Sequence, residues 1–216
     1  MTPNKEDYLK CIHELGQLEV KMSNKQIAER MQVSPPAVSE MIKKMIQEDW
    51  IKKDANKSYL LTAKGEQLVA NLFRKHRLIE VFLIEHLDYS PEEVHQEAEI
   101  LEHTVSDTFI DRLDQNLGFP TFCPHGGTIP RKNQALIEIN HQTLAEIMVL
   151  GSYRLSRIHD QIELIHYLRQ QDLKLNTDFE LVQIDAYAKT FTLSFNKKQV
   201  TIPESIAKQL FVTKLN

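Results

Sequence analysis

The stretch SNKQIAERMQVSPPAVSEMIKKM, residues 23–45, decides the fold of the first third of the chain. Ser23 with Gln26 forms a capping box that starts one helix, and Ser34 followed by Pro35 starts another. The connection between the two helices is too short for them to lie as a relaxed antiparallel pair. This pattern is typical of a helix-turn-helix, whose second helix enters the major groove of DNA.

The flanking sequence extends this motif to a winged helix. Before it, apolar residues recur at helical spacing from Tyr8 to Leu15, and after it WIKKDANKSYLLT, residues 50–62, alternates around a turn and predicts two short strands. Three helices followed by a basic hairpin is the winged-helix order. Periodicity alone would also suit another small helical domain, and the short turn favours the winged helix.

The third predicted helix buries Val38, Met41, Ile42 and Met45, so its small polar residues and lysines face outward. Small residues at a helix start suit close approach to DNA bases and backbone, and lysines suit phosphates. The alternative for the lysines is an ordinary solvated face. The candidate DNA-contacting residues are Ser34, Pro36, Ala37, Ser39 and Lys43 on this helix, with Lys25 and the wing residues Lys53, Lys57 and Ser58.

Two long helices predict a second domain. Thr62 caps a helix from about Ala63 to His86, and Pro91 opens another to about Leu117. Their apolar residues suit helix pairing within or between subunits, so we expect a homodimer.

The remainder of the chain predicts a mainly α protein with a β-rich C-terminal domain. A short helix is predicted around residues 156–169, and four segments are strand candidates. We expect three domains, at residues 1–70, 71–140 and 146–216, the last a barrel or sandwich. The strand candidates are LKL (173–175), FELVQI (179–184), TFTLSF (190–195) and KQVTI (198–202).

Charge and cysteine usage restrict the class of protein. The net charge is −4, yet residues 71–140 alone carry 12 acidic and 6 basic residues, with five of the nine histidines. Two cysteines, the lack of a signal peptide and the lack of a run of about 18 apolar residues predict a cytoplasmic protein with no membrane partner.

The acidic segment contains the pattern of a metal site. His95, Glu99, Glu102 and His103 project from one face of a helix, without lysine partners one turn away. The preceding helix carries His76 and Glu80 one turn apart, so two helices could converge on one cation. The alternative is that these side chains form a solvated surface.

A glycine-rich loop adds two further candidate ligands, the thiol of Cys123 and the imidazole of His125. Either residue alone would more often be structural, whereas the pair makes a second metal position plausible.

Other functions find less support in the sequence. The piece from Glu99 to His103 is similar to an inverted metalloprotease motif, but Glu99 replaces its first histidine, and no HExxH occurs. We therefore expect no enzyme and no small organic substrate. The other alternative is a DNA-binding regulator of the same fold that senses an organic ligand.

The whole chain resembles the diphtheria toxin repressor family, and most closely its manganese-responsive streptococcal branch of SloR and ScaR type. This resemblance implies a winged helix, a dimerisation and metal domain, and an SH3-like, FeoA-type C-terminal barrel. It also implies a metal-dependent repressor of metal uptake genes that binds a palindromic double-stranded DNA operator as a homodimer. The segments that carry it are NKEDYLKCI (4–12), residues 23–45, YLLTAKG (59–65), RKHRLIEVFL (74–83), EAEILEHTVSD (97–107), LGFPTFCPHGGTIP (117–130) and RIHD (157–160).

The family's ligands match residues of this chain one by one. Asp7, Glu99, Glu102 and His103 match a primary site, with His76 beside it. Glu80, Cys123, His125 and Asp160 match a secondary site, and His95 aligns with an accessory ligand of other members. The alternative is that Cys123 and His125 replace His95 in this chain.

The resemblance also implies the metal. Iron-type members place methionine and cysteine where this chain has Asp7 and Glu99, so its oxygen ligands favour Mn²⁺, with Zn²⁺, Cd²⁺ or Fe²⁺ possible in vitro. Two-metal manganese sensors place glutamate where this chain has Lys10, which favours two separated sites over a bridged pair.

Overall fold

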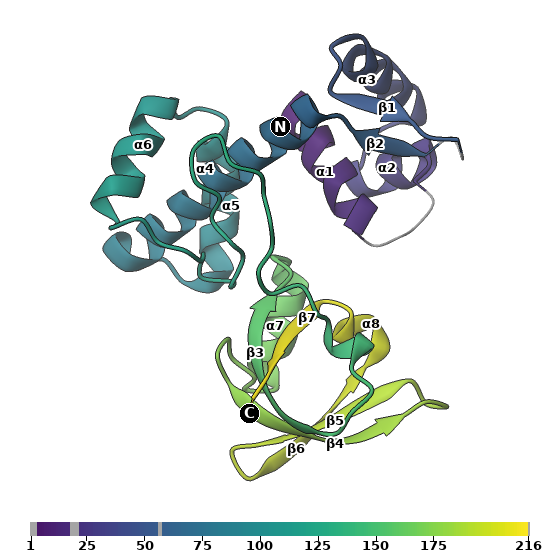
Figure 1. The fold of residues 1–216 in the computed structure, drawn as a ribbon, viewed down its shortest axis with the longest axis vertical. Coiled ribbons are helices and arrows are strands. Elements are labelled where there is room, and N and C mark those ends of the chain that lie inside the picture. Colours follow the sequence, from purple (N-terminus) through teal and green to yellow (C-terminus); the bar gives the residue numbers. More distant parts are fainter. Residues whose placement is uncertain (1–3, 18–21, 56–57, 216) are drawn as a thin grey trace. The chain divides into compact units, whose positions relative to one another are not determined.

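The computed structural model describes residues 4–17, 22–55 and 58–215 (Figure 1). The chain forms two compact units. Residues 1–75 and 130–136 make up the N-terminal unit, and residues 76–129 and 137–216 make up the C-terminal unit.

The N-terminal unit contains the predicted winged helix. Gln32 ends α2 in the left-handed region at φ 54°, and Ser34 caps α3 by accepting a hydrogen bond from the backbone N–H of Ala37. These two caps fix the short turn between the helices. The strands pair antiparallel, with Ile51 opposite Leu61. The elements are α1 (Lys5–Gln17), α2 (Asn24–Met31), α3 (Pro35–Gln47), β1 (Ile51–Lys53) and β2 (Tyr59–Leu61).

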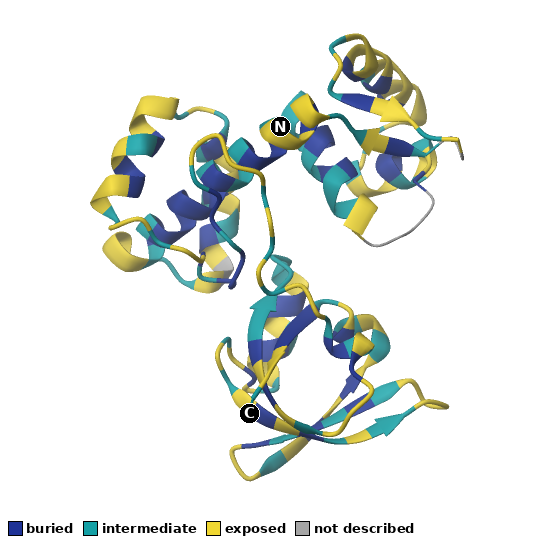
Figure 2. Ribbon diagram, viewed as in Figure 1, coloured by how far each residue is buried: buried dark blue, intermediate teal, exposed yellow. Residues whose placement is uncertain are grey.

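One side of α3 faces the core of this unit and the other faces solvent (Figure 2). Val38, Ile42 and Met45 are buried against α1 and α2, with Met41 partly buried beside them, as their spacing predicts. The opposite side of the helix is therefore available to a partner.

Asn24, the first residue of α2, connects the wing to α3. Its side-chain carbonyl accepts a hydrogen bond of 2.6 Å from the Tyr59 hydroxyl on β2, and its amide donates one of 2.9 Å to the Ser39 hydroxyl on α3. Ser39 in turn donates to the backbone carbonyl of Pro35 at 3.0 Å. Three elements of the winged helix are thus joined by side chains as well as by the chain itself.

The C-terminal unit begins within α4 (Ala63–Leu87), which matches the predicted helix to within one residue. The prediction of a single helix from Pro91 to about Leu117 is wrong. The structure has α5 (Pro91–Glu102) and α6 (Asp107–Asn116), with Ser106 accepting a hydrogen bond from the Phe109 N–H as the cap of α6. A serine that caps a new helix in this way competes with continuation of the old one. Buried apolar residues of α5, α6 and the second half of α4 form one cluster.

The rest of this unit is an antiparallel sheet of five strands in the order β6-β5-β4-β3-β7, which confirms the expected β-rich fold. Alternate residues such as Leu155, Leu181 and Leu193 point into its core. The elements are β3 (Gly151–Ile158), α7 (Ile162–Gln170), β4 (Asp178–Asp185), β5 (Thr190–Phe195), β6 (Lys198–Pro203), α8 (Glu204–Ala207) and β7 (Leu210–Lys214), with a 3-10 helix at Leu144–Glu146.

Two predictions for this region are wrong, and two of its strands were not predicted. The helix expected around residues 156–169 starts only at Ile162, because residues 151–158 form strand β3. The segment LKL, residues 173–175, is not a strand, and β7 was not predicted. Among the described residues, no helix has the length and apolarity needed to cross a membrane.

The Asn24 connection gives a testable prediction for stability. Replacing Tyr59 by phenylalanine removes the donor to Asn24 and leaves a partly buried carbonyl without it, so we expect a loss of about 1 kcal/mol in the free energy of unfolding. Chemical denaturation followed by fluorescence of Trp50, the single tryptophan, measures this in the N-terminal unit. Tyr187→Phe is the matched control, because Tyr187 is fully exposed. Equal transitions for the two variants would contradict the role of Asn24.

Candidate metal centre

Helix α4 places His76 and Glu80 one turn apart on its buried side. Their side chains are 3% and 0% exposed, and Nε2 of His76 lies 3.1 Å from Oε1 of Glu80. A carboxylate and an imidazole buried side by side need charge compensation, because the interior solvates them poorly.

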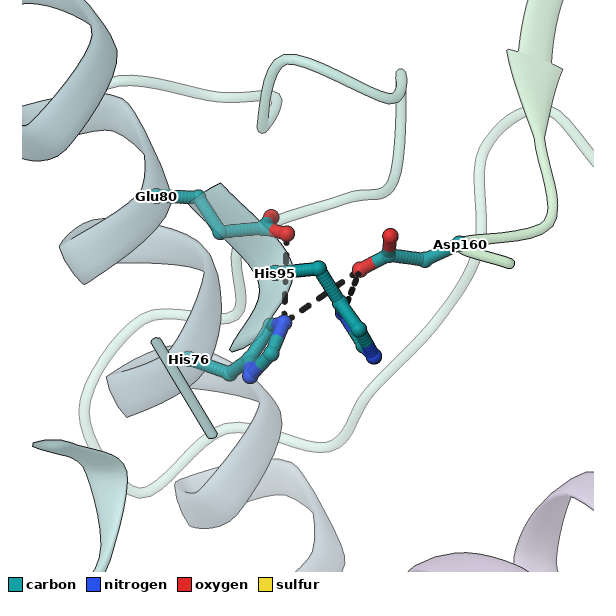
Figure 3. Close-up of side chains that lie close together, drawn as sticks. All are labelled: His76, Glu80, His95 and Asp160. Atoms are coloured by element: carbon teal, nitrogen blue, oxygen red, sulfur yellow. Dashed lines mark hydrogen bonds and ion pairs between the residues drawn. The ribbon is translucent and has the colours of Figure 1, made fainter. Parts of the chain in front are cut away.

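Asp160 approaches this pair from the segment between β3 and α7. Its Oδ2 lies 3.3 Å from Nε2 of His76 and 2.8 Å from Nδ1 of His95, which α5 contributes (Figure 3). Ligand atoms of His76, Glu80, His95 and Asp160 all lie within 4.8 Å of one another.

The loop that carries Cys123 and His125 closes the other side of Glu80. Cys123 exchanges backbone hydrogen bonds with Gly126 and Gly127, and Nδ1 of His125 lies 3.2 Å from Oε1 of Glu80. Ligand atoms of Glu80, Cys123 and His125 also lie within 4.8 Å of one another. Glu80 therefore belongs to both groups.

The predicted ligand face of His95, Glu99, Glu102 and His103 divides into two parts. His95 and Glu99 form a pair at 3.3 Å, whereas buried Glu102 lies 3.4 Å from Nε2 of His103, the C-cap of α5. Glu102 also lies 2.5 Å from Nδ1 of His76. The two nitrogens of His76 thus face different carboxylates, Glu102 on one side and Glu80 with Asp160 on the other.

Asp7 lies in the first turn of α1, in the N-terminal unit. Its carboxylate accepts a 2.7 Å hydrogen bond from the N–H of Asn4, whose side chain accepts one of 3.1 Å from the N–H of Asp7. This reciprocal pair caps the helix.

The carboxylates of Glu80 and Asp160 stay ionised. Burial and the Asp160 charge raise the pKa of Glu80, but His76 and His125 outweigh them and hold it below its usual value. Burial likewise raises the pKa of Asp160, yet His76 and His95 keep it well below the usual range.

The histidines shift in the opposite direction. Burial lowers the pKa of His95, but Asp160 and Glu99 raise it to about 9. Burial also lowers the pKa of His125, but Cys123, Glu80 and Asp160 raise it to about 11. Without a metal ion, protons on these imidazoles neutralise the carboxylates.

The donor atoms fit a divalent cation. Oε2 of Glu80, both ring nitrogens of His125 and Oδ1 of Asp160 are buried without a hydrogen bond from any described residue. Buried polar atoms are almost always hydrogen-bonded, so several unsatisfied donors and acceptors around one point indicate a missing ligand. Carboxylate oxygen, imidazole nitrogen and thiolate sulfur are the usual donors for transition metals.

The predicted DNA-contacting residues are described with one exception. Ser34, Pro36, Ala37, Ser39 and Lys43 are exposed along α3, and Lys25 and Lys53 are exposed as well. Ser58 is half-buried, and its hydroxyl accepts a hydrogen bond from the Met22 N–H, so it supports the wing. Lys57 lies outside the described residues.

Comparison with known proteins identifies the family. Residues 1–57 match "Iron dependent repressor, N-terminal DNA binding domain", residues 62–131 match "Iron dependent repressor, metal binding and dimerisation domain", and residues 142–214 match "FeoA domain". The crystal structure of the metal-dependent transcriptional regulator MtsR is 65% identical, with a TM-score of 0.91 over the whole of both chains. The chain belongs to the iron-dependent repressor family. It is a metal-dependent DNA-binding repressor. The protein is therefore not an enzyme, and the metalloprotease alternative is excluded.

Two further relatives of this iron-dependent repressor family member differ in their sequence identity to it. The structure of the manganese regulator SloR is 50% identical and covers both chains completely, with a TM-score of 0.93. The iron-dependent repressor IdeR of Mycobacterium leprae is 27% identical over 223 residues, spanning 97% of this chain and 96% of its own. The resemblance to the diphtheria toxin repressor family is confirmed.

One ligand of this centre, Asp160, could be predicted only from the resemblance to the family. The spacing of His76 and Glu80 is local, but Asp160 is 65 residues from His95 and 84 from His76. No periodicity signals such a contact, and the resemblance alone singled out Asp160. His95, set apart from the two predicted ligand sets, lies against Asp160 in the structure.

The raised pKa values predict that metal binding releases protons. At neutral pH a cation must displace protons from His95 and His125, so we expect about one or more protons released per ion at this centre and weaker binding as the pH falls. Titration calorimetry with Mn²⁺ in buffers of different ionisation enthalpy measures the release. Identical heats in all buffers would show that these histidines do not bind the ion.

Proposed function

We propose that this repressor is manganese-responsive and controls genes of metal uptake, with the ion as corepressor. It acts in the cytoplasm as a homodimer on a palindromic operator. The observation that carries this proposal is the buried cluster around Glu80, whose unsatisfied oxygen and nitrogen atoms call for a cation.

The chemistry of the donors supports Mn²⁺ as the physiological ion. Carboxylates and imidazoles suit Mn²⁺, and the relative SloR is a manganese regulator. The Irving–Williams order nevertheless gives Zn²⁺ a higher affinity for the same donors, and the thiol of Cys123 adds a preference for Zn²⁺ and Cd²⁺. Selectivity in the cell then depends on metal availability and on site geometry.

We assign the ligands to two sites by their match to the family. Glu80, Cys123, His125 and Asp160 form the secondary site, which the geometry around Glu80 supports. His95 serves it as an accessory ligand through its contact with Asp160. The proposed primary site contains Asp7, Glu99, Glu102 and His103, with His76 beside it.

The exposed side of α3 supports a role in reading DNA. Ser34, Pro36 and Ala37 at its N-terminal end are small enough for close contact with bases and backbone, and Ser39 is held in place through Asn24. We propose that Lys43, with Lys25, Lys53, Lys57 and Ser58, contacts the phosphates. The lysines fix the position on the duplex, whereas contacts to base edges select the sequence.

Exposed apolar side chains support the dimer. They lie within residues 62–131, the part that matches the dimerisation domain, and burial of exposed apolar side chains against a second copy is favourable. A homodimer presents two α3 helices to two half-sites, which accounts for a palindromic operator. The exposed side chains are Leu87, Ile100, Phe109, Phe119 and Phe122.

Metal-dependent DNA binding tests the proposal directly. With a duplex selected from a random pool in the presence of Mn²⁺, we expect Mn²⁺ to raise the affinity at least about tenfold over chelator, a typical size for coupling between two sites. Fluorescence anisotropy measures the affinity, with Mg²⁺ as the control for charge screening. Equal affinity in Mn²⁺ and in chelator would overturn the proposal, and a response to an organic effector instead would favour the alternative regulator.

Asp7 offers a sharper test of the primary site. Asp7→Ala and Asp7→Asn should both lose the response of DNA binding to Mn²⁺, because neither amide nor methyl replaces a carboxylate ligand well. Glu6→Ala, in the same helical turn, is the control. Since Asp7→Asn keeps an acceptor for the Asn4 N–H, a purely structural Asp7 would leave that variant as responsive as the wild type.

A further inference from the structure

Glu138 lies at the centre of a charged network beside the secondary site, in the segment before β3. Its Oε1 is 2.6 Å from Nη2 of Arg77 and 2.9 Å from Nη1 of Arg157, and its Oε2 accepts a 2.9 Å hydrogen bond from the Thr128 N–H. Arg77 also donates to the Thr128 carbonyl at 2.5 Å. Both backbone groups of Thr128 are therefore held by this pair.

Thr128 ends the loop that carries Cys123 and His125. Its hydroxyl accepts a hydrogen bond of 3.0 Å from the Ile139 N–H, next to Glu138. The loop is closed by the Phe122–Thr128 bridge and by the hydrogen bond from the Cys123 N–H to the Gly127 carbonyl. A displacement of Thr128 would therefore move Gly127, the next residue, and with it the carbonyl that binds the Cys123 N–H.

Close packing leaves this loop little freedom. A Cβ on Gly127 would meet the Arg77 guanidinium at 2.6 Å, and one on Gly126, at φ +81°, would meet the Ser156 carbonyl at 2.1 Å. On the far side, the Ile158 N–H donates to the His125 carbonyl at 3.0 Å. The loop is confined between α4 and β3, and the two glycines permit that approach.

We propose that Glu138, paired with Arg77, is a positioning group that sets the geometry of Cys123 and His125 for the metal ion of the secondary site. This inference rests on the proposed ligand assignment. The Glu138 carboxylate binds Arg77, Arg157 and the Thr128 N–H, and it acts on the ligands through Thr128 and the loop. Residues that orient metal ligands without binding the ion themselves typically change the metal affinity by about 10- to 100-fold when they are replaced.

The charges of the network act in the same direction. The guanidiniums of Arg77 and Arg157, both largely buried, and the one Glu138 carboxylate leave one positive charge in excess beside the loop. Loss of the Glu138 charge would leave two, and the added repulsion opposes entry of a cation.

Cd²⁺ is the probe, because a cadmium–thiolate bond gives an ultraviolet charge-transfer band that reports on Cys123 itself. In the full-length protein, Cys123→Ser should abolish the band. Glu138→Gln should weaken the Cd²⁺ affinity read from the band by at least about tenfold. Gly127→Ala, which displaces the Arg77 guanidinium while retaining Glu138, should weaken it as well.

Asp178→Asn is the matched control, since the Asp178–Arg154 pair is an exposed carboxylate–guanidinium contact in the same unit. We expect it to titrate like the wild type. Thermal unfolding of each metal-free variant separates positioning from folding, because positioning predicts a weakened band in a variant that is fully folded at the temperature of the titration. If Glu138→Gln fails to fold, the same criterion applies to Gly127→Ala.

The outcomes distinguish this inference from the proposal beneath it. A wild-type protein with no band sensitive to Cys123→Ser would refute the secondary site. If the wild type shows the band, and Glu138→Gln is folded and binds Cd²⁺ with unchanged affinity, only the role of Glu138 is refuted. Gly127→Ala takes the place of Glu138→Gln if the latter does not fold.

Discussion

The contact of the Glu80 carboxylate with two imidazoles is the interaction on which the C-terminal unit depends. Glu80 is fully buried, with His76 at 3.1 Å and His125 at 3.2 Å. A charge removed from water in this way destabilises the fold unless protons or a cation compensate it. Helix α4, the loop of residues 123–128 and the segment after β3 all converge on this point. A bound cation would therefore compensate a buried charge that otherwise destabilises the fold.

Much of the fold could be predicted because its signals are local. The caps at Ser23 and Ser34 and the i, i+4 pair of His76 and Glu80 depend on neighbours in the chain. The break before Ser106 was missed because the apolar periodicity continues through it, although the serine is itself a cap signal. Strand β3 was missed although Tyr153 and Leu155 alternate with polar residues, and its last three residues were assigned to the following helix.

The centre itself could be predicted only in part. The kinds of ligand follow from composition, but which ones meet depends on contacts between distant segments. Asp160 reaches His95 because it precedes α7, which packs against α5, and Glu138 reaches Arg77 across 61 residues. The sequence marks neither contact. Family resemblance supplied Asp160, whereas Glu138 became visible only through the geometry.

The Asn24 connection has a consequence for the entropy of DNA recognition. Tyr59, Asn24 and Ser39 hold the wing, α2 and α3 in one arrangement through contacts within the protein alone. Disordered DNA-binding segments lose conformational entropy when they fold on the duplex, and that loss subtracts from their affinity. A surface assembled in advance avoids most of this loss. Less of the free energy gained from contacts with phosphates and bases is then offset by the ordering of the protein. Discrimination between operators depends on how well the DNA fits the surface and not on folding of the protein.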